Sequence, residues 1–134
     1  MTVLRPSTVA DVMTRQVVTV FEEDSLDGLE EGMKWLRFRH LPVVDDGKLV
    51  GLLTERDLLR WAIRGPRAER TFVADVMNRH VTTVAPDTPV ARAAELMLER
   101  KIDCLPVVEG DGKLVGIVTT ADLLRLVTTL YEGG

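Results

Sequence analysis

The feature that most constrains this chain is an internal repeat. A shift of 64 positions lays VADVMTRQVVTV at 9–20 over VADVMNRHVTTV at 73–84. After a one-residue insertion, HLPVVDDGKLVGLLTERDLLR at 40–60 lies over CLPVVEGDGKLVGIVTTADLLR at 104–125. Such a repeat decides the architecture before single residues are considered, because each copy is one structural unit of the same kind.

The repeat divides the chain into two similar parts. We expect repeat 1 over residues 7–64, a linker over 65–70 and repeat 2 over 71–131, because Gly65 and Pro66 interrupt any helix at the join. Each copy is about half of the 134 residues, and a unit of this size buries too little apolar surface to be more than marginally stable alone. The two repeats are therefore predicted to pack together as one pseudo-symmetric module.

Hydrophobic periodicity predicts the order strand, helix, strand, strand, helix in each copy. In the first copy, Gly28 and Gly32 lie inside the expected helix around Leu26 to Leu36, and each costs about 1 kcal/mol against alanine. They are either tolerated imperfections or a face that a helix or a partner subunit approaches closely. The other expected elements are strands at 17–20 and 81–84, a helix from Pro89 to about Arg100, two β-hairpins carrying LPVV and KLVG, and final helices at 55–63 and 120–131.

Composition excludes several classes of function. The net charge is −4 and aromatic residues are 4%, so the chain lacks the basic face and the stacking rings of a nucleic-acid-binding protein. One cysteine and two histidines give no disulfide and no cluster at metal-ligand spacing, which fits the cytoplasm. No apolar run approaches the ~18 residues of a membrane span, and the first residues, MTVLRPSTVADVM, lack the continuous apolar core expected of a secretory signal.

Each hairpin leads directly into a helix through a Thr-x-x-Asp motif, formed by Thr54 with Asp57 and by Thr119 with Asp122. This is the spacing of a capping box, in which hydroxyl and carboxylate satisfy the first amides of a helix. The same groups could hold a ligand, because a helix start attracts anions and an acidic residue there can accept the hydroxyls of a ribose. The two roles are compatible.

The repeated segments resemble a tandem pair of CBS domains, the regulatory modules named after cystathionine β-synthase. The resemblance covers about Ser7 to Leu126 and rests on VMTRQVVTV, VMNRHVTTV and the two LPVV to DLL segments. It implies a mixed α+β fold of two β-α-β-β-α repeats related by a pseudo-two-fold axis, a Bateman module that is usually dimeric. Such modules bind adenosine-containing ligands in the two clefts between their repeats and report them to a partner.

The resemblance also implies which residues hold the ligand. In the cleft predicted to prefer a phosphorylated nucleotide, the residues are Met13, Val18, Phe38, Arg39, His40, Thr119 and Asp122. In the second cleft they are Thr54, Arg56, Asp57, Met77, Thr82, Ile102, Asp103 and Cys104. The preference follows from charge, because Arg39 and His40 can meet a phosphate whereas Asp103 repels one and Arg56 offsets it only partly.

These residues also have plainer interpretations. Arg39 and His40 can form a solvated loop, the two methionines can fill the core, and Cys104 can be a small buried hydrophobe.

The resulting hypothesis is a non-enzymatic sensor of AMP, ADP or ATP that needs no cofactor, forms a homodimer and signals to a separate, unidentified protein. S-adenosylmethionine and NAD rank behind the adenine nucleotides as ligands. The alternative is a structural or interaction protein with vestigial pockets that acts through its dimer surface. Catalysis is not expected, because the sequence has no nucleophile-base pair, Walker loop or metal motif. Neither nucleic acid nor membrane is expected as a partner.

Overall fold

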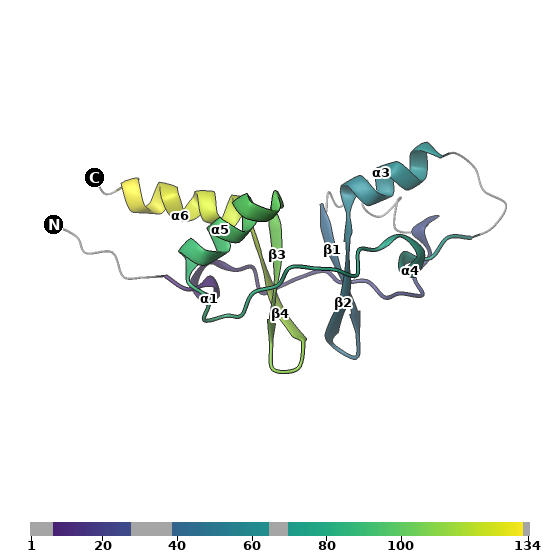
Figure 1. The fold of residues 1–134 in the computed structure, drawn as a ribbon, viewed down its shortest axis with the longest axis horizontal. Coiled ribbons are helices and arrows are strands. Elements are labelled where there is room, and N and C mark those ends of the chain that lie inside the picture. Colours follow the sequence, from purple (N-terminus) through teal and green to yellow (C-terminus); the bar gives the residue numbers. More distant parts are fainter. Residues whose placement is uncertain (1–6, 28–38, 65–69, 133–134) are drawn as a thin grey trace. The chain divides into compact units, whose positions relative to one another are not determined.

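The computed structural model describes residues 7–27, 39–64 and 70–132, which belong to two compact units (Figure 1). The central unit is built from residues 18–81, and the terminal unit combines residues 1–17 with 82–134. Each unit therefore contains the hairpin of one sequence repeat and the first segment of the other. The compact units and the sequence repeats have different boundaries.

In the central unit, β1 (His40–Asp45) and β2 (Lys48–Thr54) form an antiparallel hairpin in which His40 lies opposite Thr54. The connection consists of Asp46 and Gly47, both with positive φ, of 51° and 79°. A two-residue hairpin turn of this kind requires positive φ at both positions, which Asp-Gly supplies. Helix α3 (Glu55–Ile63) follows β2 without a loop, and the short helix α4 (Val73–Val76) contacts α3.

The terminal unit repeats this arrangement. Strands β3 (Cys104–Glu109) and β4 (Lys113–Thr119) pair with Cys104 opposite Thr119, and α6 (Thr120–Glu132) follows β4 directly. Helix α5 (Val90–Arg100) precedes β3 and ends at Lys101, whose φ of 55° is left-handed. The short helix α1 (Val9–Val12) contacts α6, and Figure 1 shows α5 and α6 beside the β3 and β4 hairpin.

Each unit has its own hydrophobic core, and segments distant in sequence share it. In the central unit, Val73 and Met77 are buried with Leu41, Val43 and Leu53. In the terminal unit the buried residues are Val9, Val84, Ala93, Met97, Leu105, Val107 and Val118. Residues 7–17 and 70–81 are therefore integral parts of these cores rather than peripheral extensions.

Most elements predicted from the sequence are confirmed, as is the mixed α+β fold. Helix α3 has the predicted bounds and α5 the predicted end. The strands predicted at 17–20 and 81–84 are wrong in extent, because only Val20 and Val84 form bridges, to Val43 and Val107. Each hairpin gains one such parallel bridge, and both valines are buried beside it.

The four-residue helices α1 and α4 were not predicted, because they are too short for a hydrophobic period. The helix predicted from Leu26 to Leu36, with its two glycines, lies mostly outside the described residues.

Candidate functional site

In the central unit, Thr54 is the last residue of β2 and Asp57 lies in the first turn of α3. Because the helix follows the strand directly, both side chains lie at the start of the helix. Oδ2 of Asp57 accepts hydrogen bonds from the Thr54 backbone N–H at 3.0 Å and from its hydroxyl at 2.9 Å. The Asp57 N–H donates in return to Oγ1 of Thr54 at 3.2 Å. The predicted capping box is confirmed, and among the described residues nothing donates to Oδ1 of Asp57.

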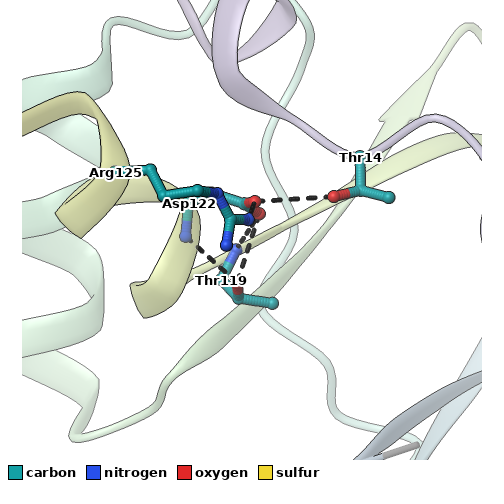
Figure 2. Close-up of polar contacts among 4 residues, drawn as sticks. All are labelled: Thr14, Thr119, Asp122 and Arg125. Carbon is teal, nitrogen blue, oxygen red and sulfur yellow. Dashed lines mark hydrogen bonds and ion pairs between the residues drawn. The ribbon is translucent and has the colours of Figure 1, made fainter. Parts of the chain in front are cut away.

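In the terminal unit, Thr119 and Asp122 form the same cap at the junction of β4 and α6. Oδ2 of Asp122 accepts from the Thr119 N–H at 2.8 Å and from its hydroxyl at 3.2 Å. Here Oδ1 is also engaged, because the Thr14 hydroxyl donates to it across 3.5 Å and the Arg125 guanidinium forms an ion pair with it (Figure 2). Asp122 is only 5% exposed, so these donors compensate a buried carboxylate.

The Thr14 hydroxyl reaches this carboxylate because the chain after α1 pairs with β4. The Thr14 N–H donates to the Ile117 carbonyl at 2.8 Å, and the Ile117 N–H donates back at 2.9 Å. Gly116 permits the approach, because a Cβ there would lie 2.7 Å from Sδ of Met13 and 2.9 Å from the Thr14 carbonyl oxygen. The backbone of the terminal unit thus positions a third polar side chain at its cap.

The central unit has the same backbone pairing but a different side chain. Leu52 and Asn78 exchange hydrogen bonds of 2.9 Å, and Gly51 faces Met77 as Gly116 faces Met13. Asn78 occupies the position equivalent to Thr14, and its Oδ1 accepts from the His80 N–H at 3.0 Å. The Asn78 side chain therefore binds the backbone of its own loop and not the cap. The two caps differ although both have a Thr-x-x-Asp motif.

The structure also places the residues that precede each hairpin. In the central unit, the Arg39 carbonyl accepts from the Glu55 N–H at 2.9 Å, and His40 lies opposite Thr54. In the terminal unit, the Asp103 carbonyl accepts from the Thr120 N–H at 3.0 Å. Each unit therefore brings its own Thr-Asp pair together with the residues before its own hairpin.

The predicted clefts combine residues of both units. Arg56 and Met77 are in the same unit as Thr54 and Asp57, and Met13 is in the same unit as Thr119 and Asp122. Val18, Arg39 and His40 belong to the central unit, whereas Thr82, Ile102, Asp103 and Cys104 belong to the terminal unit. Phe38 lies outside the described residues. The assembly of each set into one cleft stays a prediction.

Cys104 is buried beside the second cap. The pKa of its thiol is raised from 9.0 to about 12, mainly by burial and to a smaller extent by the charges of Asp103 and Asp122. The thiol stays protonated at neutral pH and is a poor nucleophile. This agrees with its interpretation as a small buried hydrophobe.

Sequence reasoning missed Thr14 and Arg125 as parts of this site. Arg125 had a signal, because an acidic and a basic residue three apart on a helix are neighbours. Thr14 had none, since 108 positions separate it from Asp122. Only the folding of residues 7–17 onto the second hairpin brings it there.

Two features are absent from the described part of the chain. Within it, no three His, Cys, Asp or Glu side chains gather closely enough to hold a metal ion. None of its helices has the length and apolar character needed to cross a membrane.

Comparison with known sequences identifies the repeats. The CBS domain family matches residues 9–64 and 73–129. The CBS domain-containing protein YhcV of Bacillus subtilis is 37% identical over 118 residues, which cover 87% of this chain and 83% of that protein. The homoserine O-acetyltransferase of Methanohalobium evestigatum is 36% identical over 121 residues, which cover 89% of this chain and 24% of the enzyme. The chain thus spans about a quarter of the length of that relative.

Solved structures agree with this match. The CBS domain pair of protein MJ0100, in complex with 5′-methylthioadenosine and S-adenosyl-L-methionine, superposes with a TM-score of 0.82 at 29% identity. That comparison covers 94% of this chain and 99% of the other. CBSX2 in complex with AMP gives a TM-score of 0.81 at 33% identity, covering 92% of this chain and 98% of CBSX2.

Proposed function

The chain belongs to the CBS-domain family, and from this premise we propose that it is a non-enzymatic regulatory module that binds an adenosine-containing ligand at its two strand-to-helix junctions. The observation that carries the proposal is the repeated Thr-Asp cap, in which one carboxylate oxygen secures the helix and the other faces away from the cap. We call Thr54 with Asp57 the central seat, and Thr119 with Asp122 the terminal seat.

The chemistry of a seat fits a nucleoside. A carboxylate can accept two hydroxyl donors from a ribose diol, as acidic residues do in dinucleotide-binding sites. The start of the following helix carries partial positive charge, which favours a phosphate or another anionic group nearby. A ligand with a ribose and an anionic substituent therefore matches both features of the junction.

The nature of the ligand is supported by the two relatives with bound adenosyl compounds. Because one holds AMP and the other S-adenosyl-L-methionine and 5′-methylthioadenosine, adenosine is the part that they share. We propose AMP, ADP or ATP as the first candidates for this chain and S-adenosylmethionine as the next.

Charge predicts a difference between the seats. The predicted clefts assign Arg39 and His40 to a phosphate held at the terminal seat. A ligand that contacted one unit alone would instead meet these two residues beside Thr54, and would meet Asp103 beside Thr119. The substitutions Asp57→Ala and Asp122→Ala can distinguish the two arrangements, because they show at which seat a phosphorylated nucleotide binds more tightly.

The test of the proposal is a thermal-shift screen with AMP, ADP, ATP, adenosine, S-adenosylmethionine and NAD, followed by calorimetric titration. A ligand at 100 times its Kd stabilises the folded state by about 2.7 kcal/mol, which raises the melting temperature measurably. We expect at least one adenosyl ligand to bind, and Asp57→Ala and Asp122→Ala each to remove one binding event. If the nucleotide prefers the terminal seat, Asp122→Ala is the more damaging change.

A second candidate function is an interaction protein that acts through an apolar surface. Leu124 and Val127 on α6 are 61% and 47% exposed, and Leu98 on α5 is 80% exposed. Such side chains are typical of a surface that another protein covers. This function would be favoured if no ligand of the panel shifted the melting temperature at millimolar concentration and light scattering showed a dimer. A homodimer, a separate regulated protein and a cytoplasmic location remain parts of both proposals.

A further inference from the structure

We propose that Arg125 is a latch on the terminal seat, so that an adenosine ligand binds there only by displacing its guanidinium from Asp122. This inference rests on the proposed function, because it concerns the carboxylate that would accept the ribose. It assigns to Arg125 control of the affinity of this seat and not of the central one.

The first step is the occupancy of the Asp122 carboxylate. A carboxylate has about four positions at which it can accept hydrogen bonds, two on each oxygen. Oδ2 accepts the Thr119 N–H and hydroxyl, and Oδ1 accepts the Thr14 hydroxyl and the Arg125 guanidinium. With all these positions in use, a ribose diol finds no acceptor until one donor leaves (Figure 2).

Of these donors, the Arg125 guanidinium is the one that leaves most easily. The Thr119 N–H and hydroxyl cap α6, and the backbone of Thr14 is fixed by its paired hydrogen bonds with Ile117. The Arg125 side chain is 68% exposed, whereas that of Asp122 is 3% exposed. A long exposed side chain can rotate into water and regain its hydration, so Arg125 is the donor that a ligand can replace.

The third step is the contrast with the central seat. Arg60 occupies the position equivalent to Arg125, but in the described part of the chain it forms no ion pair with Asp57. Oδ1 of Asp57 accepts no hydrogen bond there, and Asn78 is turned to His80. The central seat is therefore open to a diol, while the terminal seat is latched.

The experiment isolates the terminal seat in an Asp57→Ala protein and compares it with the Asp57→Ala/Arg125→Met protein by calorimetry. Adenosine is the probe, because without a phosphate it cannot lose affinity through loss of a cation. Ion pairs with an exposed partner contribute up to about 1 kcal/mol, so we expect adenosine to bind roughly two- to fivefold more tightly after the substitution. Binding of 2′,3′-dideoxyadenosine, which has no diol to displace Arg125, should stay the same.

The matched control uses the central seat. In an Asp122→Ala protein, Arg60→Met should leave the affinity for adenosine unchanged, because Arg60 does not occupy the Asp57 carboxylate. If Arg125→Met fails to fold, Arg125→Leu repeats the test with another side chain that has no hydrogen-bond donor.

The outcomes separate the two ideas. Equal or weaker adenosine binding by the folded Arg125→Met protein overturns the latch and leaves the proposed function standing. An equal gain in affinity for the dideoxy compound also overturns it, because the effect would not depend on the diol. Failure of the parent and every variant to bind any adenosyl ligand overturns the proposed function and the latch with it.

Discussion

At the scale of single residues, Asp57 and Asp122 show how one motif acquires two environments. Both accept from the preceding threonine in the same geometry, because the capping box is a local structure that four consecutive residues define. The difference lies in the second oxygen. Among the described residues, Thr14 and Arg125 reach this oxygen in Asp122, and nothing donates to it in Asp57. Residues outside the motif therefore decide how readily each carboxylate can take a ligand.

The close packing at Gly116 leads to a prediction. Alanine at this position would place a Cβ 2.9 Å from the Thr14 carbonyl oxygen, so the backbone itself must shift. We expect Gly116→Ala to lower the free energy of unfolding by about 1–3 kcal/mol, as overpacking commonly does. Urea denaturation measures the change.

Gly51→Ala is the matched comparison. There the backbone oxygen, that of Asn78, lies 3.1 Å from the added Cβ, and the closest atom belongs to the flexible Met77 side chain. A loss at Gly51 equal to or larger than that at Gly116 would contradict this explanation.

Cys104 gives a pH-dependent prediction. Burial, with Asp103 and Asp122 adding to it, raises the thiol pKa from 9.0 to about 12 in the folded protein, whereas the unfolded chain titrates near the ordinary value. The raised pKa therefore contributes fully to the stability of the folded protein below pH 9, and this contribution is lost as pH rises from about 9 toward 12. Between pH 9 and 10, the free energy of unfolding of the parent should fall by about 1 kcal/mol more than that of Cys104→Ala, as measured by urea denaturation. Identical pH dependence in the two proteins would exclude the effect.

At the scale of elements, the sequence predicts best where a helix or turn is specified by its own residues. Helix α3 was predicted with its observed bounds, because Thr54 and Asp57 cap it and Gly65 and Pro66 follow it. The hairpins were predicted from apolar runs separated by Asp and Gly. The strands at 17–20 and 81–84 were overestimated, because β-branched residues favour extended backbone without specifying a partner strand.

The first hairpin turn supports a prediction at this scale. Gly47 has a φ of 79°, and a Cβ there would meet nothing within 4 Å, so any effect of substitution comes from the backbone. A left-handed conformation costs a residue with a side chain about 1–2 kcal/mol. We expect Gly47→Val to lower the free energy of unfolding by at least this amount, as measured by thermal unfolding.

Asp46→Asn is the control, and it should change the free energy of unfolding little, because asparagine accepts the φ of 51° at this position. A comparable loss in this variant would mean that the turn geometry is not the cause.

At the scale of the whole molecule, the two units do not coincide with the two repeats. Val73 and Met77 belong to the second repeat in sequence but are buried in the core of the central unit. The hydrogen bonds between Leu52 and Asn78 join the same two segments. A chain cut between its repeats would therefore leave both cores incomplete.

Two fragments of equal length test this organisation. Residues 18–81 contain the whole central unit, whereas residues 1–64 contain the first repeat without residues 70–81. Domains of this size are marginal, so completeness of the core should decide whether they fold. We expect fragment 18–81 to unfold cooperatively in urea and to protect the Leu52 amide from exchange, and fragment 1–64 to do neither. Equal behaviour of the two fragments would contradict the importance of residues 70–81.

The sequence by itself determined the repeat, the hairpins, the main helices and the two Thr-Asp caps, because these depend on neighbours within a few residues of one another. It also indicated the family, through motifs repeated at matching spacing. The tertiary structure decided which first segment completes which core. It also decided that Thr14 and Arg125 engage Asp122, whereas none of the described residues donates to the second oxygen of Asp57. Thr14 is 108 positions from Asp122, so no local pattern could indicate that contact. The spacing of Asp122 and Arg125 is a local signal, but Asp57 and Arg60 share it, so the spacing alone does not decide that an ion pair forms.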